Sequence, residues 1–221
     1  AIRIGRAASG KDGVAICGYH GWHDWYLSAN IKGKDALSKH LLSGLTPLGV
    51  PKVLKNTVHP FQYGNFQELE KIVKKKDVGV IKMEVARNAM PDKEFLQKVR
   101  DLATRKKIIL IFDECTSGFR RNLGGIHMIC NVYPDIAMFG KALGNGFAIT
   151  AVIGKKNVMK KAERTFMSST FWSERIGFVA GLKTIQTMGK IKSWKLLISN
   201  GKYFNNKIKN LSKKYELKVN I

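Results

Sequence analysis

Residues 134–147 read PDIAMFGKALGNGF, and this stretch decides how the rest of the chain is interpreted. Its apolar run, residues 136–139, is typical of a buried strand. Lys141 follows among glycines, at the end of the strand where open α/β sheets bind ligands. A lysine in a partly apolar pocket loses its proton readily and can act as an amine nucleophile. We therefore predict that Lys141 forms a Schiff base; the alternative is a solvated lysine in a flexible glycine-rich turn.

A second stretch, residues 108–120, reads IILIFDECTSGFR. Its first five residues predict a strand buried on both faces, which ends at Asp113 and Glu114. A carboxylate at the end of a buried strand is costly unless it has a partner. A protonated pyridine nitrogen is such a partner, and this pairing is a standard device of pyridoxal phosphate enzymes. Asp113 and Lys141 are therefore predicted to serve one cofactor.

A third stretch, residues 17–23, reads CGYHGWH and follows a short apolar run. An aromatic side chain at a strand end can lie flat on a cofactor ring, although an aromatic loop packed on the core would show the same pattern. The histidines raise the question of a metal. The chain lacks three or four ligands at zinc spacings, so we predict no metal site.

Four segments together resemble the class III pyridoxal-phosphate-dependent aminotransferases: YHGWHDW, IFDECTSGFR, PDIAMFGKALGNGF and SSTFWSERIG. The nearest branch holds glutamate-1-semialdehyde aminomutase and aminotransferases for amino sugars and ω-amino acids. The resemblance runs from residue 1 to about residue 190. It implies the large domain of a type I pyridoxal-phosphate-dependent transferase, an α/β fold in three layers with a mostly parallel sheet between helices.

The resemblance also implies the chemistry. Pyridoxal 5'-phosphate would be the cofactor, and an amino group would pass from a small-molecule amino donor to a carbonyl acceptor through a Schiff base on Lys141. Intramolecular transfer by an aminomutase is the first alternative. The others are a truncated, non-catalytic remnant and a basic protein that binds nucleic acid.

Individual residues take roles from the resemblance. Lys141 corresponds to the Schiff-base lysine, and Asp113 to the partner of the pyridine nitrogen. Tyr19 has the position of the aromatic residue that stacks on the ring, with His20 beside it. Cys115 stands where the family usually has valine, packed on the opposite face of the ring, and cysteine is a small apolar substitute there.

Three further residues follow from the same resemblance. Thr170 matches a threonine that reaches the cofactor phosphate of the partner subunit, which implies a homodimer with a shared active site. Glu84 matches the glutamate of a Glu-Pro step, but Val85 replaces the proline and residues 86–88 also depart from the pattern. Because that region touches substrate in the family, the substrate stays open, with Glu84 and Trp22 as the candidate contacts.

The composition limits the class of protein. A length of 221 residues, with 44% hydrophobic and 25% charged residues, suits a soluble globular chain with one sizeable core. No apolar run is long enough to span a membrane. Three widely spaced cysteines argue against disulfides and for a reducing compartment, so we expect a cytoplasmic protein.

The net charge of +23 raises the possibility of a nucleic-acid partner. The lysines are spread over predicted helices and loops, and no nucleic-acid-binding motif accompanies them. We therefore interpret them as solvated faces and expect neither a nucleic-acid nor a membrane partner.

We expect residues 1–190 to form the large cofactor-binding domain, incomplete at its start, and residues 191–221 to form a connecting helix and the beginning of a small domain. In the family, a phosphate cradle rich in glycine and serine precedes the helix that residues 1–9 resemble. The sequence thus resembles the core of a longer enzyme.

Apolar periodicity predicts alternating strands and helices, and hence a mostly parallel sheet. Strands are expected at residues 14–17, 53–54, 57–58, 78–83, 108–112, 136–139, 148–153 (interpreted as an antiparallel edge strand) and 217–221. Helices are expected at residues 1–9, 35–43, 65–75 (with Asn65 as its cap), 92–106, 158–162, 174–188 and 194–211.

Overall fold

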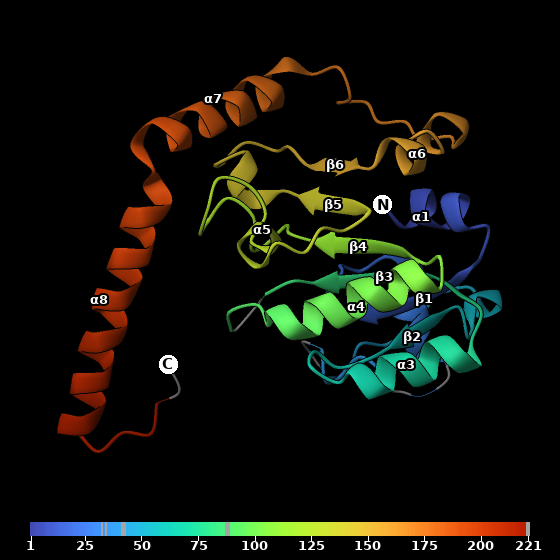
Figure 1. Ribbon diagram of the computed structural model, residues 1–221, viewed down its shortest axis with the longest axis horizontal. Helices are drawn as coiled ribbons and strands as arrows, with labels where there is room; N and C mark the ends of the chain where they lie inside the picture. The colour runs from blue at the N-terminus through green and yellow to red at the C-terminus, as the bar shows by residue number, and fades with distance from the viewer. Residues whose placement is uncertain (32, 34, 41–42, 87–88, 220–221) are drawn as a thin grey trace.

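The computed structural model describes residues 1–31, 33, 35–40, 43–86 and 89–219. Its centre is a six-stranded sheet in the order β2-β1-β3-β4-β5-β6 (Figure 1). Five strands are parallel, and β6 pairs antiparallel with β5 at one edge. The strands are β1 (Gly13–Cys17), β2 (Val58–Pro60), β3 (Val78–Glu84), β4 (Ile109–Asp113), β5 (Ile136–Phe139) and β6 (Ala151–Gly154).

The helices make the outer layers. The α-helices are α1 (Ile2–Ser9), α2 (Asp24–Leu27), α3 (Phe66–Lys75), α4 (Lys93–Arg105), α5 (His127–Cys130), α6 (Lys156–Met159), α7 (Arg175–Ile191) and α8 (Ser193–Lys214). Short 3-10 helices are η1 (Ser28–Ile31), η2 (Lys52–Leu54), η3 (Lys141–Leu143) and η4 (Ala162–Arg164).

Two apolar cores separate these layers. On one face of the sheet, α3 and α4 pack against alternate residues of the central strands, such as Ile81 and Leu110 (Figure 1). On the other face, α1 and α6 pack against Val80 and Ile111. Because successive side chains of a strand point to opposite faces, β1, β3 and β4 each contribute residues to both cores. The expected three-layer α/β arrangement is therefore confirmed.

Polar side chains cap the starts of α3 and α4. The side chain of Asn65 accepts the backbone N–H of Glu68, as the sequence predicted for α3. Asp92 caps α4 by accepting from Glu94 and Phe95. Such caps satisfy backbone donors that a helix leaves unpaired in its first turn.

Three local expectations differ from the structure. Residues 53–54 belong to the 3-10 helix η2 rather than to a strand. Two apolar residues are too few to show whether the apolar spacing is that of a strand or of a helix. Residues 35–40 form turns instead of a helix, and residues 41 and 42 lie outside the described residues. Residues 217–219 form no strand, and residues 220 and 221 are outside the description.

The last two helices leave the body of the sheet. Figure 1 shows α7 crossing above β6 and α8 extending away along one side. Exposed apolar side chains mark both helices, among them Phe178 and Leu182 on α7 and Tyr203 on α8. Among the described residues, none of these helices has the length and apolarity needed to cross a membrane.

Candidate active site

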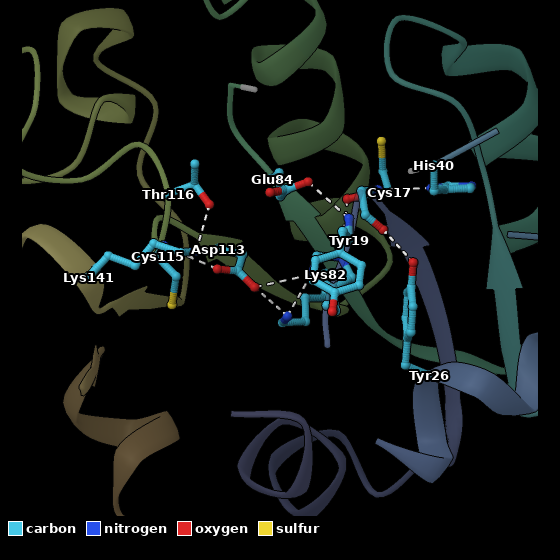
Figure 2. Close-up of polar contacts among 12 residues, drawn as sticks. Cys17, Tyr19, Tyr26, His40, Lys82, Glu84, Asp113, Cys115, Thr116 and Lys141 are labelled. Carbon is cyan, nitrogen blue, oxygen red and sulfur yellow. Dashed lines mark hydrogen bonds and ion pairs between the residues drawn. The ribbon is translucent and has the colours of Figure 1, made fainter. Parts of the chain in front are cut away.

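The carboxyl ends of three parallel strands meet at one edge of the sheet. Glu84, the last residue of β3, lies opposite Asp113, the last residue of β4. Asp113 in turn lies opposite Met138 of β5, and Lys141 follows two residues after that strand ends. The register thus brings the predicted acid and the predicted lysine to neighbouring strand ends, and Figure 2 shows Asp113 between Lys141 and Lys82.

Lys141 is the first residue of η3 and has a left-handed backbone, with φ of 44°. Left-handed backbone is uncommon outside glycine and tends to occur at functional sites. The Nζ of Lys141 donates to Oγ1 of Thr116 at 2.9 Å. The side chain is exposed, whereas the sequence suggested a partly apolar pocket. Lys141 instead lines an open pocket together with residues 146–150.

Asp113 is buried and closely surrounded. Its Oδ2 lies 2.6 Å from Nζ of Lys82 and 3.1 Å from Nδ1 of His20, and its Oδ1 accepts the backbone N–H of Cys115. Burial works to raise the pKa of Asp113. The contacts with His20 and the positive charge of Lys82 outweigh burial and hold this pKa below its usual range. Asp113 is therefore a carboxylate in the folded chain.

Lys82 is the functional residue that sequence reasoning missed. It lies inside β3, where it is 2% exposed, and its Nζ also lies 2.7 Å from Nδ1 of His20. The Nζ is 5.5 Å from the ring centre of Trp25, close enough for a cation–π contact. A lysine is almost never fully buried unless it is paired. Its position inside the apolar run of β3 was therefore the signal that could have found it.

His20 joins the same cluster. Its Nε2 lies 3.1 Å from the carbonyl oxygen of Cys17, and its ring stacks on Trp25. Burial first, and then the charge of Lys82, lower the pKa of His20 to about 4, so the ring is neutral near pH 7. His20 lies beside Tyr19, as expected, but its ring is directed to Asp113.

Tyr19 and Glu84 connect the ends of β1 and β3. The backbone N–H of Tyr19 donates to Oε2 of Glu84 at 2.9 Å. Gly18 makes this approach possible, because a Cβ there would lie 2.4 Å from Oε2 of Glu84. A cavity of about 330 Å³ opens beside Glu84 and is also lined by His40 and Tyr63.

The remaining predicted site residues are Cys115, Trp22 and Thr170, and each is at least partly exposed. Cys115 is half-buried, and burial followed by the charge of Asp113 raises the pKa of its thiol to about 12. The thiol is therefore neutral, as a substitute for valine would be. Trp22 is 81% exposed and stacks on His23. Thr170 is exposed between η4 and α7; its expected contact is with a partner subunit, which a single chain does not test.

Glu114, the neighbour of Asp113, holds the loop that carries Thr116. It is fully buried and accepts from the hydroxyl of Ser117. It also contacts both the backbone nitrogen and Nδ1 of His127, at 2.9 and 2.8 Å. Buried carboxylates need such partners. Glu114 therefore has a structural role, and no group of metal-binding type occurs among the described residues.

Comparison with known proteins points to one family. The sequence model described as aminotransferase class-III matches residues 17–221. The chain is 34% identical to the 3-aminobutyryl-CoA aminotransferase of Cloacimonas acidaminovorans, over 100% of this chain and 51% of the relative. It is also 34% identical to the glutamate-1-semialdehyde 2,1-aminomutase of Sulfolobus acidocaldarius, over 85% of this chain and 46% of that relative.

Solved structures share the fold. The FumI protein of Sphingopyxis sp. MTA144, in a form with pyridoxal phosphate, superposes with a TM-score of 0.84 at 19% identity, over 97% of this chain and 50% of that chain. An omega-transaminase from Sphaerobacter thermophilus gives 0.72 at 24% identity, over 85% of this chain and 46% of that chain. The chain spans about half the length of the relatives it matches.

Proposed function

The chain belongs to the class III aminotransferase family, as its motifs predicted, and from that premise we propose that it transfers an amino group from a small-molecule amino donor to a carbonyl acceptor, with pyridoxal 5'-phosphate as cofactor. One observation carries the proposal. An ionised, buried Asp113 and the amine of Lys141 come from adjacent parallel strands and meet at the carboxyl edge of the sheet, where α/β folds bind their ligands.

The residues at this edge fit the cofactor. Asp113 offers a carboxylate to the pyridine nitrogen, Tyr19 an aromatic face to the ring, and Cys115 a small neutral side chain to its other face. The amine of Lys141 is available for the cofactor aldehyde. Bound pyridoxal phosphate supplies an electron sink for the substrate carbon that loses its proton.

Lys141 has two tasks in this proposal. Its Nζ would hold the cofactor through the aldehyde group until an amino donor replaces it. Its amine would also take up and return the proton of the reacting substrate carbon, as general base and general acid. Thr116 holds Nζ through the hydrogen bond of 2.9 Å and thereby limits the directions in which the amine points.

The substrate side of the site is proposed around Glu84. The cavity of about 330 Å³ beside this residue could hold the part of the donor or acceptor that does not react. Trp22, exposed at the rim of the same edge, is the second candidate contact. Relatives of equal identity are an aminotransferase and an aminomutase, so intramolecular amino transfer is the second candidate function.

The proposed assembly is a homodimer with a shared site. Thr170 would reach the cofactor phosphate of the partner subunit. Exposed apolar residues on α7, such as Ile176, Phe178 and Val179, support an apolar contact with another surface. We further propose residues 1–190 as the cofactor-binding domain and residues 191–221 as its link to a small domain. Three free cysteines suit a cytoplasmic location.

The test uses the full-length protein that carries this chain. Borohydride reduction should fix the cofactor on Lys141, and a Lys141→Ala variant should lose that adduct. Lys160→Ala, at an exposed lysine outside the strand ends, is the matched control and should keep it. An adduct mapped to another lysine would refute the assignment. Conversion of an amino aldehyde without an added acceptor would select the aminomutase.

A further inference from the structure

The cavity beside Glu84 is built at the carboxyl ends of β1 and β3. Cys17, the last residue of β1, lines it together with Gly18 and Glu84, and its volume is about 330 Å³. Met90 and two alanines add apolar surface. Substrate pockets typically combine apolar walls with a few polar groups that fix the orientation of the ligand. The polar groups of this cavity therefore indicate which substrates fit.

His40 presents a hydrogen-bond donor at this cavity. Its Nδ1 accepts the backbone N–H of Gly18 at 2.9 Å (Figure 2). Burial lowers the pKa of His40, although the charge of Glu68 acts in the opposite direction, so the ring is neutral near pH 7. A neutral imidazole that accepts at Nδ1 carries its proton at Nε2. Nε2 has no hydrogen-bond partner among the residues that the structure describes, so its N–H can serve a ligand.

Lys39 brings a positive charge to the same cavity. Its side chain is exposed and forms no ion pair within the described part of the chain. Tyr63 adds a further donor, because its hydroxyl accepts the backbone N–H of Asp92 at 3.0 Å and keeps its own proton. Burial raises the pKa of Tyr63, so this hydroxyl stays protonated near pH 7. The cavity thus offers an ammonium group and two neutral donors.

The carboxylates near the cavity are engaged within the fold. Oε2 of Glu84 accepts the backbone N–H of Tyr19 at 2.9 Å. Oε2 of Glu68 accepts the backbone N–H of Gln62, also at 2.9 Å. The thiol of Cys17 is neutral, because burial and then the charge of Glu84 raise its pKa to about 12. A cation beside neutral donors favours an anionic ligand, since hydrogen bonds to a charged acceptor are the stronger ones.

We propose that Lys39 and His40 bind an anionic group, a carboxylate or a phosphate, on the part of the substrate that does not react. The inference rests on the proposed function and deepens it, because it names substrates with an acid group remote from the reacting carbon. The acid pairs with Nζ of Lys39 and accepts from Nε2 of His40, while the reacting end faces Lys141. Holding the remote acid orients the reacting end, so Lys39 and His40 determine specificity and take no part in proton transfer.

Glutarate tests this site without reacting, because it has two carboxylates and no amine. The full-length holoenzyme is titrated with glutarate while the ring of His40 is followed by ¹⁵N NMR. Glutarate should shift the Nε2 resonance, and glutaramide, its uncharged counterpart, should bind at least about tenfold more weakly. Lys39→Met should weaken glutarate binding about tenfold, as expected for the loss of one charged hydrogen bond. Lys39→Arg keeps the charge and should retain most of the affinity. Lys55→Met, at an exposed lysine outside the cavity, is the matched control and should leave the affinity unchanged.

The outcomes separate this inference from the proposed function. Equal binding of glutarate and glutaramide, an unmoved resonance of His40 or an unchanged affinity in Lys39→Met would overturn the inference. Inorganic phosphate is titrated in parallel, and a shift of the same resonance at a lower concentration than glutarate would identify the remote acid as a phosphate. A holoenzyme with its cofactor fixed on Lys141 by borohydride, but with no response of His40 to either anion, would refute this inference alone. A protein that forms no such adduct would refute the proposed function, whatever the anions do.

Discussion

Replacement of Lys82 by methionine should raise the pKa of His20 and make the loss of stability depend on pH. In the wild type, burial and the charge of Lys82 lower the pKa of His20 from 6.5 to about 4, while Asp113 acts in the opposite direction. Without Lys82, the carboxylate of Asp113 is the remaining charged neighbour within hydrogen-bond distance of His20 in this cluster, at 3.1 Å. The pKa of His20 should therefore move upward from about 4.

The sign of the pH dependence follows from proton binding. The pKa of His20 is lower in the folded wild type than in the unfolded chain, so the unfolded chain binds more protons and stability falls as pH drops from 6.5 toward 4. At about 1.4 kcal/mol per pKa unit, the loss reaches roughly 3 kcal/mol at the acid end of that window. In Lys82→Met this loss shrinks, because the folded pKa is higher.

At neutral pH, Lys82→Met should lower the stability of the fold because it breaks the ion pair between Lys82 and Asp113. Removing one partner of a buried pair typically costs about 3–5 kcal/mol, because the other charge is left uncompensated. At pH 5, protonated His20 can replace the missing cation beside Asp113. The difference in unfolding free energy between wild type and variant should therefore be largest near pH 7 and smaller at pH 5.

The measurements are urea unfolding of the cofactor-free protein at both pH values and an NMR titration of the His20 ring. Lys98→Met, which removes an exposed lysine paired with Glu94 on α4, is the control and should leave the titration of His20 unchanged. An unchanged pKa of His20 in Lys82→Met, or an equal loss of stability at pH 7 and pH 5, would refute the coupling.

Three further predictions concern the scaffold and the rim. Asp135→Asn should weaken the charged hydrogen bond of 2.9 Å that Asp135 accepts from Arg100. Each charged hydrogen bond weakened in this way should lower the free energy of unfolding, measured in urea, by about 1.5–3 kcal/mol. Gly18→Ala should reduce cofactor binding and lower the melting temperature. The backbone φ of residue 18 is 104°, and the new Cβ would lie 2.4 Å from Oε2 of Glu84. An unchanged melting temperature and unchanged cofactor binding would contradict this packing. Trp22→Ala should change stability by less than about 0.5 kcal/mol and raise KM, and an unchanged KM would remove Trp22 from the substrate contacts.

Local sequence was sufficient for most of the secondary structure. Uninterrupted apolar runs predicted β4 and β5, and the cap at Asn65 predicted the start of α3, because burial and capping are read over a few neighbouring residues. The elements that were predicted wrongly from the sequence, such as η2, are short, and their apolar residues show no repeating spacing.

The sequence also pointed to Asp113 and Lys141 as site candidates. Asp113 directly follows one apolar run and Lys141 follows another after a single glycine, so their places at strand ends could be inferred without knowledge of the fold. The motifs around them were specific enough to predict the family, which the comparison with known sequences confirmed.

Only the tertiary structure decided which groups surround Asp113. His20 and Lys82 are 62 residues apart, and His20 and Asp113 are 93 residues apart, and they meet because β1, β3 and β4 pair in parallel with their carboxyl ends together. In the sequence, Lys82 is one polar residue in an apolar run. The register of β3 beside β4 turns it into the counter-ion of Asp113, because a cation buried there has no water to solvate it and needs the carboxylate at 2.6 Å.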